Sequence, residues 1–198
     1  MKRLVPFLIA LVLPALARAD GADWSIDPVH TVSGFSVRHL VISNVRGQFG
    51  KTTGTVKLDE QDLVKSSVEV SVDTTTIDTR VPDRDTHLKS PDFLDVTKFP
   101  AMTFKSTRIE KAGEGRYKVT GDLTIKGNTK PVVLDVSGPT AAITDPWGNA
   151  RRGVSATATI NRKDFGLNWS KVIEAGPVVG DEVKIEIEAE LVKPAPKK

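Results

Sequence analysis

The three histidines, His30, His39 and His87, are the residues best suited to metal binding or acid–base catalysis in this chain. Neutral imidazole is a common metal ligand, and its pKa lies close to neutrality. However, His30 and His39 are nine positions apart, and an odd spacing places two side chains on opposite faces of a regular strand. Neither an H-x-H nor an H-E-x-x-H pattern occurs. We therefore expect no metal and no catalytic residue, and predict neutral imidazoles that hydrogen-bond to the backbone or to Asp27 and Asp85.

Arg84 and Asp85 are the other pair that could exchange protons, but we interpret them as an ion pair that ties down a long connection. The chain has no Gly-x-Ser-x-Gly, P-loop or dinucleotide-binding pattern, so no cofactor is indicated. The absence of cysteine excludes thiol catalysis and thiolate metal ligands. Trp147 and Trp169 are candidates either for the rim of a binding site or for ordinary packing. A metal-dependent or other enzyme using His30, His39 and His87 is kept as the alternative function.

Residues 1–19 have the pattern of a secretory signal peptide. A basic pair precedes an apolar stretch over residues 4–13, and Ala17-Arg18-Ala19 is a small-x-small cleavage site. The apolar stretch is too short to span a bilayer. We expect export and cleavage after Ala19.

The charge balance changes when this segment is removed. It contains three of the 28 basic residues and no acidic one, so 25 basic residues remain against 25 acidic ones. A neutral chain makes nucleic acid a poor partner, and we predict none. The remaining length suits one domain, which we place at residues 20–192. Residues 193–198, KPAPKK, have nothing to bury and are predicted to form a disordered tail.

The elements that must position any site are predicted to be strands. From Val183 to Leu191, apolar residues alternate with Lys and Glu, which is typical of a strand with one buried and one solvated face. Short turn signals separate further stretches and favour antiparallel neighbours. We predict an all-β, eight-stranded antiparallel barrel, with other strands at 30–38, 47–58, 65–73, 101–111, 116–126, 130–138 and 152–162.

Short helical segments are expected in two connections of this barrel. Residues 40–45 are predicted to form a helical cap. Residues 77–99 are predicted to contain helical turns, with Ser90 as N-cap and Pro91 at the first helical position.

The periodicity also predicts which side chains point inward. The set carries no charge and is rich in Val and Ala, with Gly54 and Gly121 in the same rows. An eight-stranded barrel is at the size where the interior is either filled by side chains or holds one small ligand. These residues alone do not decide between a filled interior and a ligand cavity. The predicted inward residues are Phe35, Val37, Val56, Leu58, Val68, Val70, Val72, Met102, Phe104, Tyr117, Val119, Leu123, Ile125, Val132, Leu134, Val136, Val154, Ala156, Ala158, Ile160, Val183, Ile185, Ile187, Ala189 and Leu191.

Residues 24–49, WSIDPVHTVSGFSVRHLVISNVRGQF, resemble the opening of the YceI-like family, which reads W-x-I-D-x-x-H-T-x-x-x-F-x-V-x-H-L-x-x-S-x-V-x-G-x-F. Further blocks that resemble the family lie at 77–106, 121–134, 165–167 and 179–183, so the likeness covers nearly the whole mature chain. It implies a lipocalin-like barrel that carries a polyisoprenoid or a similar long lipid, such as an isoprenoid quinone, in the periplasm of a double-membraned bacterium.

With this resemblance, we predict a non-enzymatic carrier for a long neutral lipid. Transient membrane contact for lipid exchange and a homodimer are left open, and a solid-core structural stress protein is a further alternative. The apolar residues of two connections, 40–45 and 93–99, are expected to close one end of the barrel. The predicted lipid-binding residues are Phe35, Val37, Leu40, Ile42, Val45, Val70, Phe93, Leu94, Phe99, Met102, Phe104, Leu123, Ile125, Ala156, Ala158 and Ile160.

Overall fold

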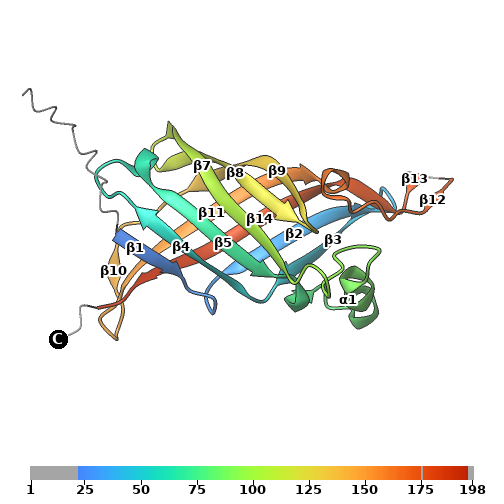
Figure 1. Cartoon of the computed structure of the whole chain (residues 1–198), viewed down its shortest axis with the longest axis horizontal. Helices are drawn as coiled ribbons and strands as arrows, with labels where there is room; N and C mark the ends of the chain where they lie inside the picture. The colour runs from blue at the N-terminus through green and yellow to red at the C-terminus, as the bar shows by residue number, and fades with distance from the viewer. Residues whose placement is uncertain (1–21, 175, 196–198) are drawn as a thin grey trace, which may run out of the picture.

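Figure 1 shows the computed structural model of the chain, in which residues 22–174 and 176–195 are described. The predicted signal peptide lies outside these residues. The secondary structure consists of strands, three short 3₁₀ helices and one α-helix within this described part. The elements are β1 (Ala22–Ile26), β2 (Val32–His39), β3 (Ser43–Phe49), β4 (Thr52–Leu58), η1 (Leu63–Lys65), β5 (Ser67–Asp73), η2 (Thr74–Thr76), β6 (Ile77–Asp78), α1 (Pro82–Lys89), β7 (Ala101–Gly113), β8 (Arg116–Ile125), β9 (Asn128–Ser137), β10 (Ile143–Thr144), β11 (Ala150–Asn161), η3 (Arg162–Phe165), β12 (Val172–Ile173), β13 (Gly176–Pro177) and β14 (Val179–Lys193).

The strands close into the predicted eight-stranded antiparallel barrel. β14 closes it, because one edge pairs with β11 along its length and the other pairs first with β2 and then with β1. β1 and β2 therefore act as one bent strand, and β3 and β4, which pair with them, act as another. Full closure removes the exposed strand edges that invite aggregation. In Figure 1, α1, β12 and β13 lie at one end of the barrel, and β10 and the last residues of β14 lie at the other.

The sequence prediction places several strand boundaries wrongly. The predicted strand 47–58 is broken at Gly50 and Lys51, and β1 was not predicted. The predicted helical cap at residues 40–45 is wrong, since residues 40–42 form a hairpin turn in which Leu40 and Val41 have φ of 52° and 62°. The pairing of His39 with Ser43 continues the ladder up to this turn, so the segment completes a hairpin.

The helix prediction in the long connection is correct in kind but displaced. α1 begins at Pro82 and ends before Ser90, which is its C-cap instead of its N-cap. The same start signals, a proline at the first turn followed by acidic residues, occur nine positions earlier at Pro82, Asp83 and Asp85. The sequence therefore contains two possible helix starts, and the helix begins at the first of them, Pro82.

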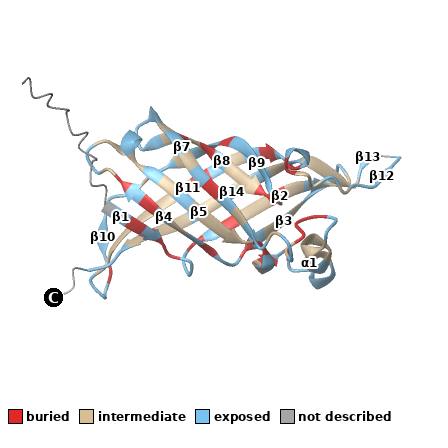
Figure 2. Ribbon diagram, viewed as in Figure 1, coloured by how far each residue is buried: buried red, intermediate tan, exposed pale blue. Residues whose placement is uncertain are grey.

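The barrel interior contains two apolar clusters. The cluster nearer α1 is built around Phe49, Leu94, Ile160 and Phe165, and partly buried side chains from several strands pack against it. The cluster nearer the opposite end is centred on Trp24, which is 1 % exposed and has the Arg152 guanidinium 5.4 Å from its ring centre. Figure 2 shows buried positions on many of the strands around the barrel, as expected for a wall with one inward face.

The ends of the chain have simple features. β14 continues to Lys193, and the Ala195 amide donates to the Asn149 side chain at 3.3 Å, so the predicted disordered tail begins inside ordered structure. Residues 196–198 lie outside the described part. Within the described residues, no helix has the length and hydropathy needed to cross a membrane.

Candidate functional site

An apolar cavity of about 330 Å³ runs inside the barrel. Its lining extends from Leu88 and Leu167 near α1 to Leu63 and Pro139 at the opposite end, and the lining surface is almost wholly apolar. Ligand pockets for small molecules are typically ~300–1,000 Å³ and mostly apolar. The cavity is therefore large enough for a ligand, and its chemistry suits hydrocarbon.

Most of the inward face predicted from periodicity lines this cavity. In that set, Val132 and Ala158 pack into the apolar cluster near α1 without lining the cavity. Leu88 and Leu167, which lie outside the regular strands, line it without having been predicted. Of the predicted lipid-binding residues, the cavity brings together Phe35, Val37, Val70, Phe93, Leu94, Met102, Phe104, Leu123, Ile125, Ala156 and Ile160.

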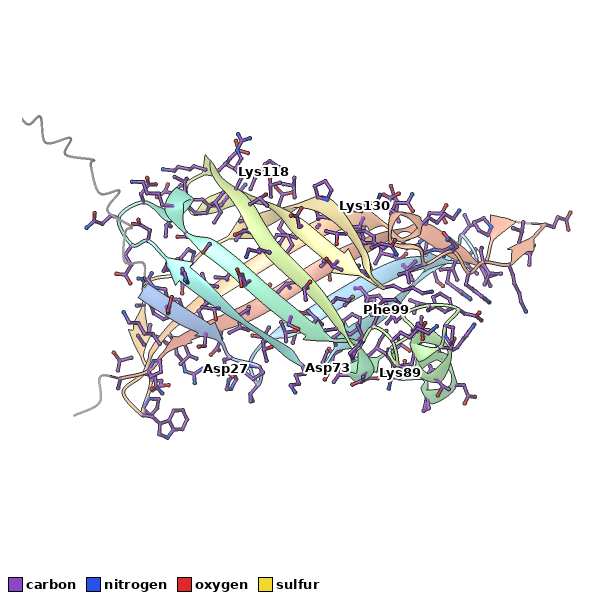
Figure 3. All side chains as sticks on the ribbon, viewed as in Figure 1. Asp27, Asp73, Lys89, Phe99, Lys118 and Lys130 are labelled. Atoms are coloured by element: carbon purple, nitrogen blue, oxygen red, sulfur yellow. The ribbon has the colours of Figure 1, made fainter. Side chains whose placement is uncertain are left out.

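The other predicted site residues lie elsewhere. Leu40, Ile42 and Val45 belong to the hairpin formed by β2 and β3, and Ile42 is 75 % exposed. The Phe99 ring packs beside Gly127, where an added Cβ would lie 2.8 Å from a ring carbon. Figure 3 shows Phe99 near the α1 end of the barrel. Apolar character identified these residues, but it could not distinguish the cavity wall from neighbouring packing or from a projecting hairpin.

Three rings form a cluster at the α1 end of the cavity. The ring centre of Phe93 lies 5.0 Å from that of His87 and 5.2 Å from that of Trp169, and the His87 and Trp169 centres are 5.0 Å apart. His87 Nε2 also pairs with Asp92 at 2.9 Å, in place of the predicted Asp85. Phe93 lines the cavity and is 8 % exposed, and the other two rings pack against it at the α1 end of the cavity. We call it the mouth cluster.

Arg162 is a charged residue that lines the cavity, which the sequence analysis did not predict. It is 2 % exposed, and its guanidinium donates to the carbonyls of Leu167, Trp169, Val179 and Gly180 and to Asp181. Burial lowers its pKa, and the nearby Asp181 opposes that shift. The guanidinium thereby ties the segment carrying Trp169 to the beginning of β14. Position 162 continues the inward row of Val154, Ala156, Ala158 and Ile160, but a buried arginine needs acceptors, and the alternation alone does not show which carbonyls supply them.

A second polar cluster surrounds Arg151 where β11, β14 and the loop after β1 meet. Its Nη1 lies 2.7 Å from both Asp27 Oδ2 and Glu190 Oε2, and its Nε lies 2.8 Å from Asp145 Oδ2. Burial acts to raise the pKa of Asp145, but hydrogen bonds from Arg151, Asn149 and two backbone amides hold it at about 2. The pKa of Asp27 is held well below its usual range in the same way. These shifts mark a structural ion-pair network.

The histidines do not gather into one site. His30 Nδ1 pairs with Asp27 Oδ2 at 2.9 Å, as predicted, whereas His39 ends β2 and His87 lies on α1. Among the described residues, Asp27, His30 and Glu190 form a group with the spacing of metal ligands. The Arg151 guanidinium already pairs with both carboxylates of this group, so it supplies the positive charge that a metal ion would otherwise supply.

Arg84 and Asp85 are joined through Thr79 instead of directly to each other. Arg84 donates to the Thr79 hydroxyl and carbonyl at 2.7 and 2.8 Å, and Asp85 accepts from the Thr79 amide at 2.9 Å. Thr79 is 4 % exposed. Both residues anchor α1 to the chain after β6, as expected for this connection, but the predicted ion pair between them is wrong, because each binds Thr79.

The family profile described as the YceI-like domain matches residues 24–191. Protein YceI of Shigella flexneri is 37 % identical over 97 % of this chain and 98 % of its own length. A UPF0312 protein of Vibrio cholerae is 37 % identical over 93 % of this chain and 97 % of its own length.

Solved structures with the same fold include two at low identity. BcnA of Burkholderia cenocepacia has a TM-score of 0.72 at 23 % identity, covering 83 % of this chain and 98 % of its own. A polyisoprenoid binding domain of Saccharophagus degradans has a TM-score of 0.64 at 12 % identity, covering 86 % of this chain and 98 % of its own. The chain, with its closed barrel and apolar cavity, belongs to the YceI-like family.

Proposed function

We propose that this protein is a periplasmic carrier that holds the hydrocarbon chain of a long neutral lipid, of the polyisoprenoid class, inside the barrel. The observation that carries the proposal is the apolar cavity, which extends from Leu88 at the α1 end to Pro139 at the other. Each methylene transferred from water into such a space contributes ~0.8 kcal/mol. A long chain can therefore bind well with few polar contacts.

The polar groups of the cavity favour a neutral ligand. An ionised carboxylate or phosphate is costly to bury unless it is paired and hydrogen-bonded. Arg162 is the charged residue at the cavity wall within the described part, and it already donates to four carbonyls and Asp181. It therefore offers little to an anionic head group, and we place the head group at the mouth cluster.

The lipid class and the location rest on further support. The Saccharophagus degradans domain of the same fold is a polyisoprenoid binding domain. For the location, the support is the signal-peptide pattern of residues 1–19. N-terminal sequencing of the exported protein is expected to give Asp20 as the first residue.

The experiment that tests the function is mass spectrometry of an organic extract of the purified protein. We expect one polyisoprenoid per barrel. A delipidated sample is then offered a neutral isoprenoid and a fatty acid of equal chain length, as a matched pair. Retention of the neutral lipid alone supports the proposal, whereas an empty extract with no uptake, or preferential uptake of the fatty acid, contradicts it. Metal analysis of the same sample tests the alternative of a metal-dependent enzyme that uses His30, His39 and His87.

A further inference from the structure

Two hairpins project from the α1 end of the barrel and carry exposed aliphatic side chains. The turn between β2 and β3 exposes Val41 by 49 % and Ile42 by 75 %, and β12 exposes Val172 by 80 % and Ile173 by 45 %. We call these four residues the hairpin tips. Clustered aliphatic side chains in water, unlike single ones, usually mark an interaction surface.

The hairpin tips form one surface. The Leu40 amide donates to the Val178 carbonyl at 3.0 Å, and the Val178 amide donates to the Lys171 carbonyl at 2.9 Å. A Cβ placed on Gly176 would lie 3.3 Å from a Val41 methyl, so the two hairpins touch. Figure 1 shows β12 and β13 at the extreme end of the long axis, beyond the barrel wall.

This surface adjoins the end of the cavity. Val37 and Val179 line the cavity, and Val179 pairs with His39 directly before the turn that carries Val41 and Ile42. Arg162 binds the carbonyls of Trp169 and Val179, which ties the mouth cluster to the base of the second hairpin. Whatever binds the hairpin tips is therefore brought next to the cavity end.

The charge around the hairpin tips is basic on one side. Residues 38–46, RHLVISNVR, contain Arg38 and Arg46 and no acidic residue, and both arginines are exposed. The second hairpin contains Lys171 and Glu174, whose opposite charges cancel. Basic residues beside an apolar tip favour an anionic lipid surface, at ~1 kcal/mol per residue near the surface.

We propose that the hairpin tips insert into the surface of an anionic lipid bilayer and hold the mouth cluster against it, so that a lipid passes between bilayer and cavity with little exposure to water. This inference rests on the proposed carrier function. A bilayer fits better than a protein partner, because a stable protein interface buries about 800 Å² per partner. Four aliphatic side chains on two narrow hairpins expose far less, yet a few such side chains suffice for interfacial anchoring.

The first test uses a polarity-sensitive dye on a single introduced cysteine, which is unique because the natural chain has none. Ile42→Cys carries the dye at the hairpin tips, and Ile143→Cys carries it on β10, where the native side chain is 65 % exposed. With vesicles of phosphatidylcholine and phosphatidylglycerol, the dye at position 42 is expected to shift to the blue and the dye at position 143 is not. The shift is expected to weaken in pure phosphatidylcholine and at high salt.

The second test uses the double variant Ile42→Asn/Val172→Asn. Vesicle co-sedimentation is expected to weaken by about tenfold or more, because the inserted apolar surface is lost. Transfer of a fluorescent isoprenoid from vesicles is expected to slow in parallel. The control pair Val29→Asn/Ile143→Asn removes two comparably exposed aliphatic side chains elsewhere, at 82 % and 65 % exposure, and is expected to behave like the natural protein.

The outcomes separate this inference from the carrier function. If the tip variant retains isoprenoid added in solution but binds vesicles and transfers lipid as the natural protein does, the insertion proposal is wrong and the carrier survives. If the natural protein takes up no isoprenoid while the dye still shifts on vesicles, the carrier function fails and the docking surface stands. A blue shift without vesicles, accompanied by dimer formation in sedimentation, assigns the hairpin tips to a second copy and overturns the proposal.

Discussion

Ala156 is a small side chain in the wall of the cavity. It is 6 % exposed and pairs with Ile187 and Val136 on the neighbouring strands, all three lining the same space. We predict that Ala156→Phe fills part of the cavity and reduces lipid loading at least severalfold. The free energy of unfolding is expected to change by no more than ~1–3 kcal/mol, because the ring enters existing space.

The matched control for this prediction is Thr157→Phe, on the same strand but with its side chain exposed outside the barrel. Extraction and mass spectrometry of both variants give the loading, and urea unfolding gives the stability. A folded Ala156→Phe protein with full lipid content means that the chain of the lipid runs elsewhere.

We predict that the folded protein loses stability in acid, because the lowered pKa of Asp145 ties its charged form to the fold. Its folded pKa of about 2 lies below the ordinary value of 3.8, so its charged form stabilises the fold above pH 3.8. This contribution is lost as the pH falls from 3.8 through about 2. Asp27, whose pKa is also lowered, acts in the same direction. We expect urea midpoints to fall over this range.

The variant Asp145→Asn is expected to be less stable at neutral pH and to show a flatter pH dependence below pH 3.8. Asp135→Asn, which removes an exposed pair with Lys118, is the control and is expected to leave the acid profile unchanged. An Asp145→Asn profile parallel to that of the natural protein would show that the Arg151 network does not set the acid sensitivity.

At the scale of elements, the turn between β2 and β3 stores backbone strain. Leu40 and Val41 both have positive φ, which costs residues with a Cβ roughly 1–2 kcal/mol each. We predict that Leu40→Asn/Val41→Gly, a pair suited to this turn, raises the free energy of unfolding by about 1 kcal/mol or more. Thermal melting measures the gain, and an unchanged or lower midpoint refutes the strain. Vesicle binding is expected to weaken, because Val41 belongs to the hairpin tips.

The mouth cluster joins the connection after α1 to the segment between η3 and β12. Phe93 contacts both His87 and Trp169 and lines the cavity, so Phe93→Ser removes the central ring. We predict that this change speeds the release of a fluorescent isoprenoid more than it lowers the melting temperature of the lipid-free form. A collapse of the melting temperature with an unchanged release rate would make Phe93 ordinary core.

The control for Phe93→Ser is a change of an aromatic residue at the end of the barrel opposite the mouth cluster. Trp147 is 77 % exposed in the turn before β11, so Trp147→Ser removes a ring without touching the mouth cluster. It is expected to leave the release rate unaltered. The sequence left the roles of both tryptophans open, and the structure places Trp169 at the mouth and Trp147 away from it.

At the scale of the whole molecule, the barrel is expected to gain stability from its lipid. A ligand that binds only the folded state adds free energy that rises with the logarithm of its concentration, about 2.7 kcal/mol at a hundredfold excess over Kd. We predict that delipidation lowers the melting temperature and that reloading with a neutral isoprenoid restores it. Calorimetry of the delipidated, reloaded and fatty-acid-treated protein measures this. Identical melting temperatures would contradict binding inside the folded barrel.

The sequence by itself determined the architecture and most of the inward face. Side chains alternate along a strand, so the apolar and charged rows from Val183 to Leu191 identify the core side without knowledge of the fold. In a closed barrel, one face of every strand points to the interior and the other points to solvent, so the alternation directly separates interior from exterior residues. For this reason the barrel and nearly all the predicted inward residues agree with the structure, although β1 was missed and the predicted strand 47–58 is broken at Gly50 and Lys51.

The tertiary structure alone decided where empty space remains and what covers it. A glycine in an inward row suggests empty space inside the barrel. At Gly121, however, the Phe104 ring already occupies the place that a side chain would take. Arg162 lies in the inward row of the predicted strand 152–162, but the carbonyls that allow its burial are brought together only by folding. Leu40 and Ile42 are as apolar as the wall residues, yet the hairpin carries them beyond it. Periodicity reports the face of a side chain, whereas a cavity, a mouth and a projecting tip depend on contacts between segments distant in sequence.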